Sequence, residues 1–312
     1  MARDSVLADL GAKGADGGAA HELTEAVRRY RIDRAPVCLA DHDPADTGPF
    51  TTRDRGLARA LLRAHTAWLT DRQRALAAQG QWAVLVVLQG RDAAGKDSLI
   101  RHVMSGLNPQ SCDVTSFGVP NEEELRHDFL WRCQRHLPAQ GTVGVFNRSH
   151  YEEVLVVRVR PDLLRAQRLH PSLVGPGVWD QRLRDIAAFE DYLSRNGTAI
   201  VKIFLNVSKE EQKERFLGRL RNPAKHFKFS PSDIRDREHW DAYTEAYEAA
   251  LGATSTPEAP WYVVPADRKW FARLAVASIL VHTIAELDLE HPAPLLADPE
   301  ELQAARAALE DA

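Results

Sequence analysis

A short glycine-containing segment offers the clearest chemistry in this sequence. Residues 90–96 read GRDAAGK, which is the G-x-x-x-x-G-K spacing of loops that bind phosphate. The two glycines allow backbone N–H groups to turn inward around a phosphate group, and Lys96 can reach its outer oxygens. An ordinary turn between a strand and a helix is the alternative. We favour phosphate binding because an apolar run at residues 83–88 precedes the segment and a helix-forming stretch from Ser98 follows it.

The residue after the lysine departs from the usual form of such loops. Asp97 stands where a serine or threonine usually holds magnesium. The third expected strand ends at Asn147, where this architecture usually places a magnesium-organising aspartate. A neutral amide is a poor magnesium ligand but a good hydrogen-bond partner for metal-bound water. We therefore expect Asp92, within the loop, to anchor the metal.

Two charged side chains follow Asn147. Arg148 would project into the crevice at the carboxyl ends of the strands, and we expect it to be a phosphate clamp rather than a surface charge. Glu152 is either a second site residue or simply the start of the next helix, and the sequence leaves both interpretations open.

A basic segment lies further along the chain. Residues 213–237 contain eight basic residues against three acidic ones, although the whole chain has a formal net charge of −4. Arg215 and Arg219 are four residues apart and share a helix face. A solvated basic helix is the simpler interpretation. Because the segment follows the fourth expected strand, where P-loop kinases have their lids, we expect a lid over about residues 213–250 that closes on phosphate groups.

Apolar patterning predicts the elements that position these residues. Strands that alternate with helices predict an α/β fold with a five-stranded parallel sheet. The expected strands are residues 83–88, 112–117, 141–146, 199–206 and 261–264. The expected helices are residues 56–80, 121–133 and 178–195, one from Ser208 with a capping box completed by Glu211, one from Ser230 to Leu251, and residues 266–287.

Length and composition limit the class of protein. Of the 312 residues 44% are hydrophobic and 27% charged, and no apolar run approaches the roughly 20 residues of a membrane span. We expect a cytoplasmic protein that binds neither membranes nor nucleic acid, with three unpaired cysteines. Residues 1–20 are expected to be disordered, residues 21–290 to form one domain that includes the lid, and residues 291–312 to form a helical tail.

Six stretches of the chain together resemble the polyphosphate kinase type 2 family. They are LQGRDAAGKD (88–97), RHVMSGLNPQ (101–110), EELRHDFLWR (123–132), FNRSHYEEVLVVRV (146–159), KFSPSDIRDREHWDAY (228–243) and TSTPEAPWYVVPADRKWFARL (254–274). They occur in order, and the resemblance covers roughly residues 22–285.

The resemblance implies a thymidylate-kinase-like P-loop kinase fold, a three-layer sandwich around the five-stranded parallel sheet with a helical basic lid. It also implies reversible, magnesium-dependent transfer of a terminal phosphoryl group between inorganic polyphosphate and nucleoside mono- or diphosphates. The reactions would convert AMP to ADP and ADP to ATP. The resemblance also suggests that this chain assembles as a dimer or a tetramer.

The resemblance further implies roles for single residues. Asp92, Lys96 and Arg148 would be catalytic, with Asp92 as the metal ligand. Asn147 and Glu152 would set the acceptor, because this form of the strand end resembles members that also accept monophosphates. The phosphate-binding residues would be Gly90, Arg91, Ala93, Ala94, Gly95, Asp97, Ser98 and Arg101, and the basic lid residues would be Arg215, Arg219, Lys225, Lys228 and Arg235.

Two departures from the family pattern leave nucleotide preference open. His226 and Phe227 precede Lys228 where a tryptophan is expected, and Ser98 stands where glycine is frequent. Two other functions also stay open. An ATP-dependent nucleoside monophosphate kinase would share the loop and lid but normally has Ser or Thr after the loop lysine. A non-catalytic binding regulator would fit the replacement of the usual magnesium ligands.

Overall fold

The computed structural model describes residues 27–33, 36–291 and 298–310. Its five strands form one parallel sheet in the order β2-β3-β1-β4-β5, as predicted. The strands are β1 Ala83–Gln89, β2 Cys112–Ser116, β3 Val143–Asn147, β4 Thr198–Asn206 and β5 Trp261–Pro265. Because β1 lies between β3 and β4, the segments that follow these three parallel strands lie close together at the carboxyl edge of the sheet.

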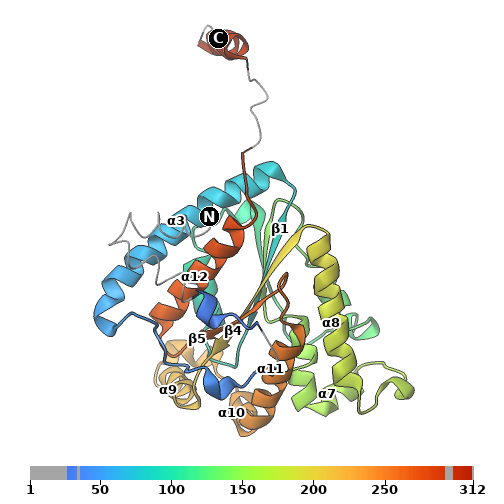
Figure 1. The fold of residues 1–312 in the computed structure, drawn as a ribbon. Helices are drawn as coiled ribbons and strands as arrows, with labels where there is room; N and C mark the ends of the chain where they lie inside the picture. Colours follow the sequence, from blue (N-terminus) through green and yellow to red (C-terminus); the bar gives the residue numbers. More distant parts are fainter. Residues whose placement is uncertain (1–26, 34–35, 292–297, 311–312) are drawn as a thin grey trace.

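Helices cover both faces of the sheet and form three layers with it (Figure 1). The α-helices are α3 Arg55–Gln79, α4 Lys96–Val103, α5 Trp131–Gln134, α6 Val156–Val159, α7 Pro161–Ala166, α8 Val178–Arg195, α9 Lys209–Leu220, α10 Pro231–Glu238, α11 Trp240–Thr254, α12 Lys269–Ala285 and α13 Pro299–Glu310. Short 3-10 turns are Leu39–Asp41, Thr52–Asp54, Pro109–Ser111, Glu124–Arg126, His150–Glu153, Pro171–Leu173 and η7 Pro223–Lys228.

The alternation of side chains along β1 explains the two cores. Val84, Val86 and Leu88 pack in the cluster that contains α3, α4 and α12, while Leu85 and Val87 pack in the cluster that contains α8 and α11. Since successive residues of a strand face opposite sides, a continuous apolar run is what a strand covered on both faces requires.

Two predicted helices are each divided in two. Asn121 caps the turn Glu124–Arg126, but the backbone becomes extended at His127, and Asp128 accepts the Leu130 N–H to begin a new turn that leads into α5. Because Asp128 caps a new turn, the helix expected over residues 121–133 is divided at His127.

The helix expected from Ser230 to Leu251 is divided at His239, whose backbone leaves the helical region between α10 and α11. The helix expected over residues 266–287 begins later, at Lys269, because Asp267 lies in the preceding connection and accepts from the N–H and hydroxyl of Ser208.

The same contact overturns the predicted capping box. Ser208 does accept the Glu211 N–H at 3.1 Å and so caps α9. The Glu211 carboxylate, however, pairs with Arg215 at 2.9 Å. Asp267 takes its place at the Ser208 N–H, so a residue distant in sequence completes the cap.

A buried polar network fixes the segment that follows β3. Lys202 on β4 donates to the Glu190 carboxylate on α8 at 2.5 Å, to the Thr254 carbonyl at 2.6 Å and to the Tyr151 hydroxyl at 3.1 Å. Oε1 of Glu190 lies 2.8 Å from the Tyr151 hydroxyl and 3.2 Å from His150 Nε2. Because all five residues are buried, the turn after β3 has few alternative positions.

No helix in the described part of the chain is long and apolar enough to cross a lipid bilayer. The expected disorder of residues 1–20 concerns residues outside those that the structure describes.

Candidate active site

Residues 90–96 form the tight turn between β1 and α4. Lys96, the first residue of α4, turns its ammonium back into this turn and donates to the Gly90 carbonyl at 2.6 Å and to the Arg91 carbonyl at 3.5 Å. At Gly90 φ is +153°, and a Cβ atom would lie 3.0 Å from the Leu205 carbonyl oxygen. The close approach of the loop to β4 therefore requires glycine.

Arg215 on α9 braces this loop. From the sequence, Arg215 is expected to be a lid cation that faces phosphate, but its side chain is buried and all five of its N–H groups donate to protein acceptors. The acceptors are the carbonyls of Ala93 at 2.9 Å, Ala94 at 2.6 Å, Ala266 at 2.5 Å and Asp267 at 3.2 Å, and the Glu211 carboxylate at 2.9 Å. Arg215 therefore joins the loop to the end of β5.

Arg148 follows β3 in a left-handed backbone conformation, with φ +63°, which costs a residue other than glycine about 1 kcal/mol or more. Its guanidinium donates to the Asp92 carboxylate at 2.8 Å and lies 3.9 Å from that of Glu152. These charges, Glu152 first, raise the pKa of Arg148. Burial raises the pKa of Glu152 and, with the repulsion of Arg148, lowers that of Lys96.

Asp97 and Asn147 face each other across the loop. The Asn147 amide donates to Asp97 Oδ1 at 3.1 Å and to Ser116 Oγ at 3.3 Å, and Lys228 lies 3.5 Å from Asp97 Oδ2. Burial opposes ionisation of Asp97, but the Asn147 hydrogen bond and the Lys228 charge outweigh it and lower the pKa of this carboxyl. Asp97 therefore ties both the strand end and the lid to α4.

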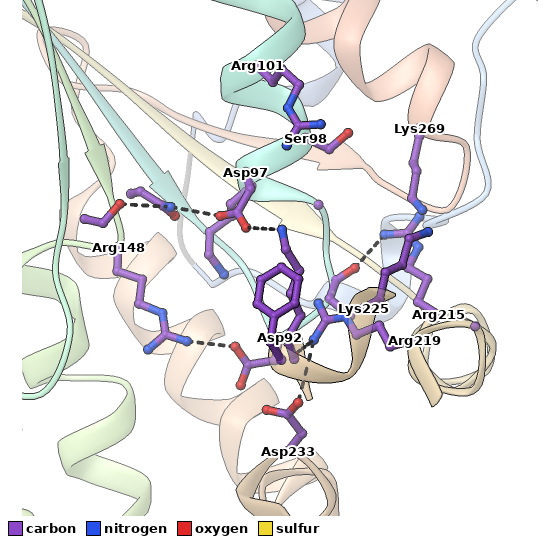
Figure 2. Close-up of a pocket in the computed structure, with 18 of the residues that line it drawn as sticks. Asp92, Asp97, Ser98, Arg101, Arg148, Arg215, Arg219, Lys225, Asp233 and Lys269 are labelled. Carbon is purple, nitrogen blue, oxygen red and sulfur yellow. Dashed lines mark hydrogen bonds and ion pairs between the residues drawn. The ribbon is translucent and has the colours of Figure 1, made fainter. Parts of the chain in front are cut away.

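The basic segment folds back over the loop as α9, η7 and α10. Arg219 donates to the Lys228 carbonyl at 2.8 Å and lies 3.6 Å from Asp233, while Arg237 donates to the Lys209 carbonyl at 2.8 Å. Figure 2 shows side chains of this segment and of the loop around one hollow.

This hollow is a cavity of about 1020 Å³. Basic residues outnumber acidic ones eight to five in its lining. The lining residues are Asp92, Ala93, Gly95, Lys96, Asp97, Ser98, Arg101, Ser116, Phe117, Gly118, Asn147, Arg148, Glu211, Glu214, Arg215, Gly218, Arg219, Lys225, Phe227, Lys228, Asp233 and Lys269. A cavity of this charge suits a polyanion.

Five residues expected at the site do not line this cavity: Gly90, Arg91, Ala94, Glu152 and Arg235. Arg91 points the other way, with its guanidinium 3.9 Å from the centre of the Trp240 ring and 2.5 Å from Thr244 Oγ1. Glu152 is placed as a partner of Arg148, and Arg235 is exposed on α10.

Nine lining residues were not predicted from the sequence: Ser116, Phe117, Gly118, Glu211, Glu214, Gly218, Phe227, Asp233 and Lys269. Lys269 lies in the matched stretch at residues 254–274, so a signal for it was available. Phe117 and Gly118 follow the edge strand β2, and only the strand order brings them beside the loop.

The donor set of the cavity fits magnesium held jointly with substrate phosphates. Asp92 and Asp97 offer carboxylate oxygens, and the amide oxygen of Asn147 is buried without a hydrogen-bond partner. Among the described residues no group of three or more His, Cys, Asp or Glu side chains could form a metal cage. Magnesium is commonly bound in this way, by one or two carboxylates with phosphates and waters.

Comparison with known proteins agrees with this geometry. The family model described as Polyphosphate kinase 2 (PPK2) matches residues 53–292. The chain is 48% identical over 266 residues to an ADP-polyphosphate phosphotransferase of Rhodopseudomonas palustris, covering 85% of this chain and 92% of that protein. It is 46% identical over 269 residues to an AMP/ADP-polyphosphate phosphotransferase of Meiothermus ruber, covering 86% and 96%.

A solved structure gives the same result for the fold. The crystal structure of polyphosphate kinase 2 from Arthrobacter aurescens TC1 superimposes with a TM-score of 0.83 at 38% identity, covering 92% of this chain and 97% of that one. The predicted P-loop kinase fold is confirmed. With a matching family model over most of its length and close relatives covered almost completely, the chain belongs to the polyphosphate kinase 2 family.

Proposed function

We propose that this chain transfers a terminal phosphoryl group reversibly between inorganic polyphosphate and AMP or ADP. The observation that supports this most is the phosphate-binding loop opening into a cavity in which basic side chains outnumber acidic ones. An inorganic donor has neither base nor sugar to recognise, so cations and backbone N–H groups suffice to bind it. The names of the Rhodopseudomonas and Meiothermus relatives support the same donor and acceptors.

The protein contributes positioning and charge rather than covalent chemistry. Lys96 exchanges the Gly90 carbonyl for an oxygen of the transferring phosphoryl group, and the loop N–H groups bind its remaining oxygens. Arg148, oriented by Asp92, bridges donor and acceptor. No general base is needed, because the attacking oxygen already belongs to a phosphate. The lid cations Arg219 and Lys228 exclude water on closure.

Magnesium, held by Asp92, Asp97 and Asn147 together with the substrate phosphates, would neutralise charge on the phosphate oxygens. We propose that the enzyme accepts AMP because residue 147 is asparagine. An aspartate at this position would add one more carboxylate to this end of the cavity. The cytoplasmic location and the dimeric or tetrameric assembly stay predictions from the sequence.

A phosphotransfer assay tests the proposal. The purified protein is given magnesium, AMP or ADP, and either long-chain polyphosphate, ATP or GTP, and products are separated by ion-exchange chromatography. ATP from ADP and ADP from AMP are expected with polyphosphate. Turnover with nucleoside triphosphates alone would identify an ATP-dependent monophosphate kinase. Binding without turnover of any donor would identify a regulator.

A further inference from the structure

Arg91 belongs to the phosphate-binding loop, but its side chain points away from the cavity toward α11. Its guanidinium lies 3.9 Å from the centre of the Trp240 ring and 5.6 Å from that of Tyr247. It donates to Thr244 Oγ1 at 2.5 Å and to the Trp240 carbonyl at 3.4 Å. These three partners recur at helical spacing, so one face of α11 receives the whole side chain.

Trp240 stands at the junction between the lid and the rest of the domain. It is the first residue of α11 and follows His239, where the backbone leaves the helical region after α10 (Figure 1). Further along α11, the side chains of Ala246, Ala250 and Leu251 are buried in the core. A short break between a surface helix and a core helix is where a lid changes its angle. The Arg91 contact therefore reaches the hinge of the lid.

The lid helices α9 and α10 are fastened to the next residue of the loop. Gln212 on α9 donates to the Asp92 carbonyl at 2.8 Å and accepts from Arg237 on α10 at 2.7 Å. Arg237 also donates to the Lys209 carbonyl at 2.8 Å, and the Lys209 ammonium lies 5.7 Å from the centre of the Trp240 ring. The contacts form a closed circuit that leaves the loop at one residue and returns to it at the next.

The same two loop residues contact the groups proposed to act on the transferring phosphoryl. The Asp92 carboxylate accepts from Arg148 at 2.8 Å, and the Arg91 carbonyl lies 3.5 Å from the Lys96 ammonium. A misplacement of about 1 Å in such groups can cost roughly a hundredfold in rate. A side chain that fixes residues 91 and 92 therefore affects the chemistry without contacting substrate.

We propose that Arg91 is a positioning residue that couples the loop to the lid through Trp240. This proposal rests on the proposed function. The contact fixes how the lid helices lie over the loop, so that Arg219 and Lys228 meet a donor bound there. Because coupling between two sites is reciprocal, a donor bound to the loop also stabilises the closed lid.

Amide hydrogen exchange in α10 tests the coupling without turnover. In the unaltered protein, saturating long-chain polyphosphate is expected to slow exchange over residues 231–238 by roughly tenfold. In Arg91→Met and Trp240→Leu, each saturated with the same polyphosphate, the slowing should be less than about twofold. Titration with polyphosphate alone establishes the saturating concentration for each variant.

Initial rates with polyphosphate and ADP give a second measurement. In Arg91→Met and Trp240→Leu, kcat is expected to fall roughly ten- to a hundredfold. KM for polyphosphate should change much less, because the cations that line the cavity are retained. Arg91→Lys and Trp240→Phe keep a cation and a ring face, so each should recover part of the rate. The double variant Arg91→Met with Trp240→Leu should be no slower than the slower single variant.

A matched control removes a similar contact elsewhere. Arg135 places its guanidinium 4.9 Å from the centre of the Trp131 ring, and neither residue lines the cavity. Arg135→Met should therefore leave both kcat and the slowing of exchange in α10 unchanged. Thermal unfolding of every variant shows whether a lost rate merely follows lost stability.

Three results would overturn the coupling. They are exchange in α10 that polyphosphate does not slow in the unaltered protein, slowing in Arg91→Met equal to that of the unaltered protein, and a kcat of Arg91→Met within about twofold of the unaltered value. In each case the unaltered protein would still use polyphosphate, so the proposed function would stand. Failure of the unaltered protein to use polyphosphate would contradict both proposals.

Discussion

Lys96 shows how one side chain shapes the loop and prepares it for substrate. Its ammonium is bonded to the Gly90 carbonyl at 2.6 Å, so the loop already surrounds a positive charge before any phosphate binds. An acceptor within the loop can be exchanged for a phosphate oxygen without rebuilding the backbone. Preorganisation of this kind is the main source of electrostatic catalysis.

Replacing Lys96 with alanine is expected to lower turnover by about a thousandfold or more, because the transferring phosphoryl group loses its closest cation. Lys96→Met keeps the buried stem and should lose the same activity with less change in thermal stability. Initial rates with polyphosphate and ADP, beside unfolding curves, measure the two effects. Near-normal turnover of either variant would remove Lys96 from the mechanism.

Asn147→Asp is expected to change both metal dependence and acceptor choice. It places a second carboxylate about where the Asn147 amide now lies 3.1 Å from Asp97, and two carboxylates this close favour a shared cation. The magnesium concentration for half-maximal rate should fall roughly tenfold, and the rate with AMP relative to the rate with ADP should fall as well. A magnesium midpoint and an acceptor ratio equal to those of the unaltered protein would contradict this.

Residue spacing predicted which side chains lie near the loop but not where each one points. Gly90 and Lys96 could be placed because the motif fixes the backbone itself. Arg91 is adjacent to Gly90 in sequence, yet its guanidinium packs on the Trp240 ring. Arg215 donates to the Ala266 carbonyl, which follows β5. Only tertiary partners decide such directions, so a single sequence does not contain them.

At the scale of elements, the pair of Glu190 on α8 and Lys202 on β4 links a helix to the sheet beside the turn after β3. Glu190→Gln would leave the Lys202 ammonium buried without a countercharge, and a loss of about 3–5 kcal/mol in the free energy of unfolding is expected. The double variant Glu190→Met with Lys202→Met removes both charges. Its loss in the free energy of unfolding should be smaller than the sum of the losses in Glu190→Met and Lys202→Met alone. Denaturant unfolding measures this coupling, and strictly additive losses would contradict it.

His65, inside α3, should make this helix sensitive to acid. Burial lowers the pKa of His65 from 6.5 to about 4. Because the unfolded chain binds this proton more readily, stability is complete above about pH 6.5 and decreases as the pH falls toward 4, by about 2 kcal/mol at pH 5. His65→Gln should lose less stability between pH 7.5 and pH 5 than the unaltered protein. Denaturant unfolding at both pH values measures the loss in each protein. Equal losses in His65→Gln and in the unaltered protein would contradict the role given to His65.

Elements with strong local signals were predicted closely. The helix expected over residues 178–195 is α8, with the same bounds, because its apolar periodicity is uninterrupted. The helix expected over residues 121–133 is divided because Asp128 caps a second turn, and α12 starts late because Asp267 bonds to Ser208. Competing caps and distant partners are the signals that periodicity does not contain.

At the scale of the whole molecule, the chain is acidic overall, with a net charge of −4, while basic residues outnumber acidic ones in the lining of the cavity beside the phosphate-binding loop. Attraction for a polyanion must therefore be local. Charges of opposite sign elsewhere on the surface are screened over roughly 8–10 Å at moderate salt, so they do not cancel the attraction inside the cavity.

Donor binding should consequently depend on salt more than acceptor binding does. If three or four cations contact the polyphosphate, the logarithm of its affinity should fall against the logarithm of salt concentration with a slope of roughly −2 to −4. KM for the donor and for ADP, measured from about 50 to about 200 mM NaCl, gives the comparison. A donor KM independent of salt would contradict binding by cations.

The brace formed by Arg215 links activity to the order in which the chain is made. Its guanidinium joins the loop after β1 to carbonyls at Ala266 and Asp267, which lie beyond the last strand, and Lys269 follows just after them. A chain emerges from the ribosome with its N-terminus first. A nascent or truncated chain that stops before residue 266 has the loop and the lid, but Arg215 lacks the two acceptors that fix the loop to the end of the sheet. Incomplete translation products are therefore expected to be inert, so that nucleotides meet a working enzyme only once synthesis is nearly finished.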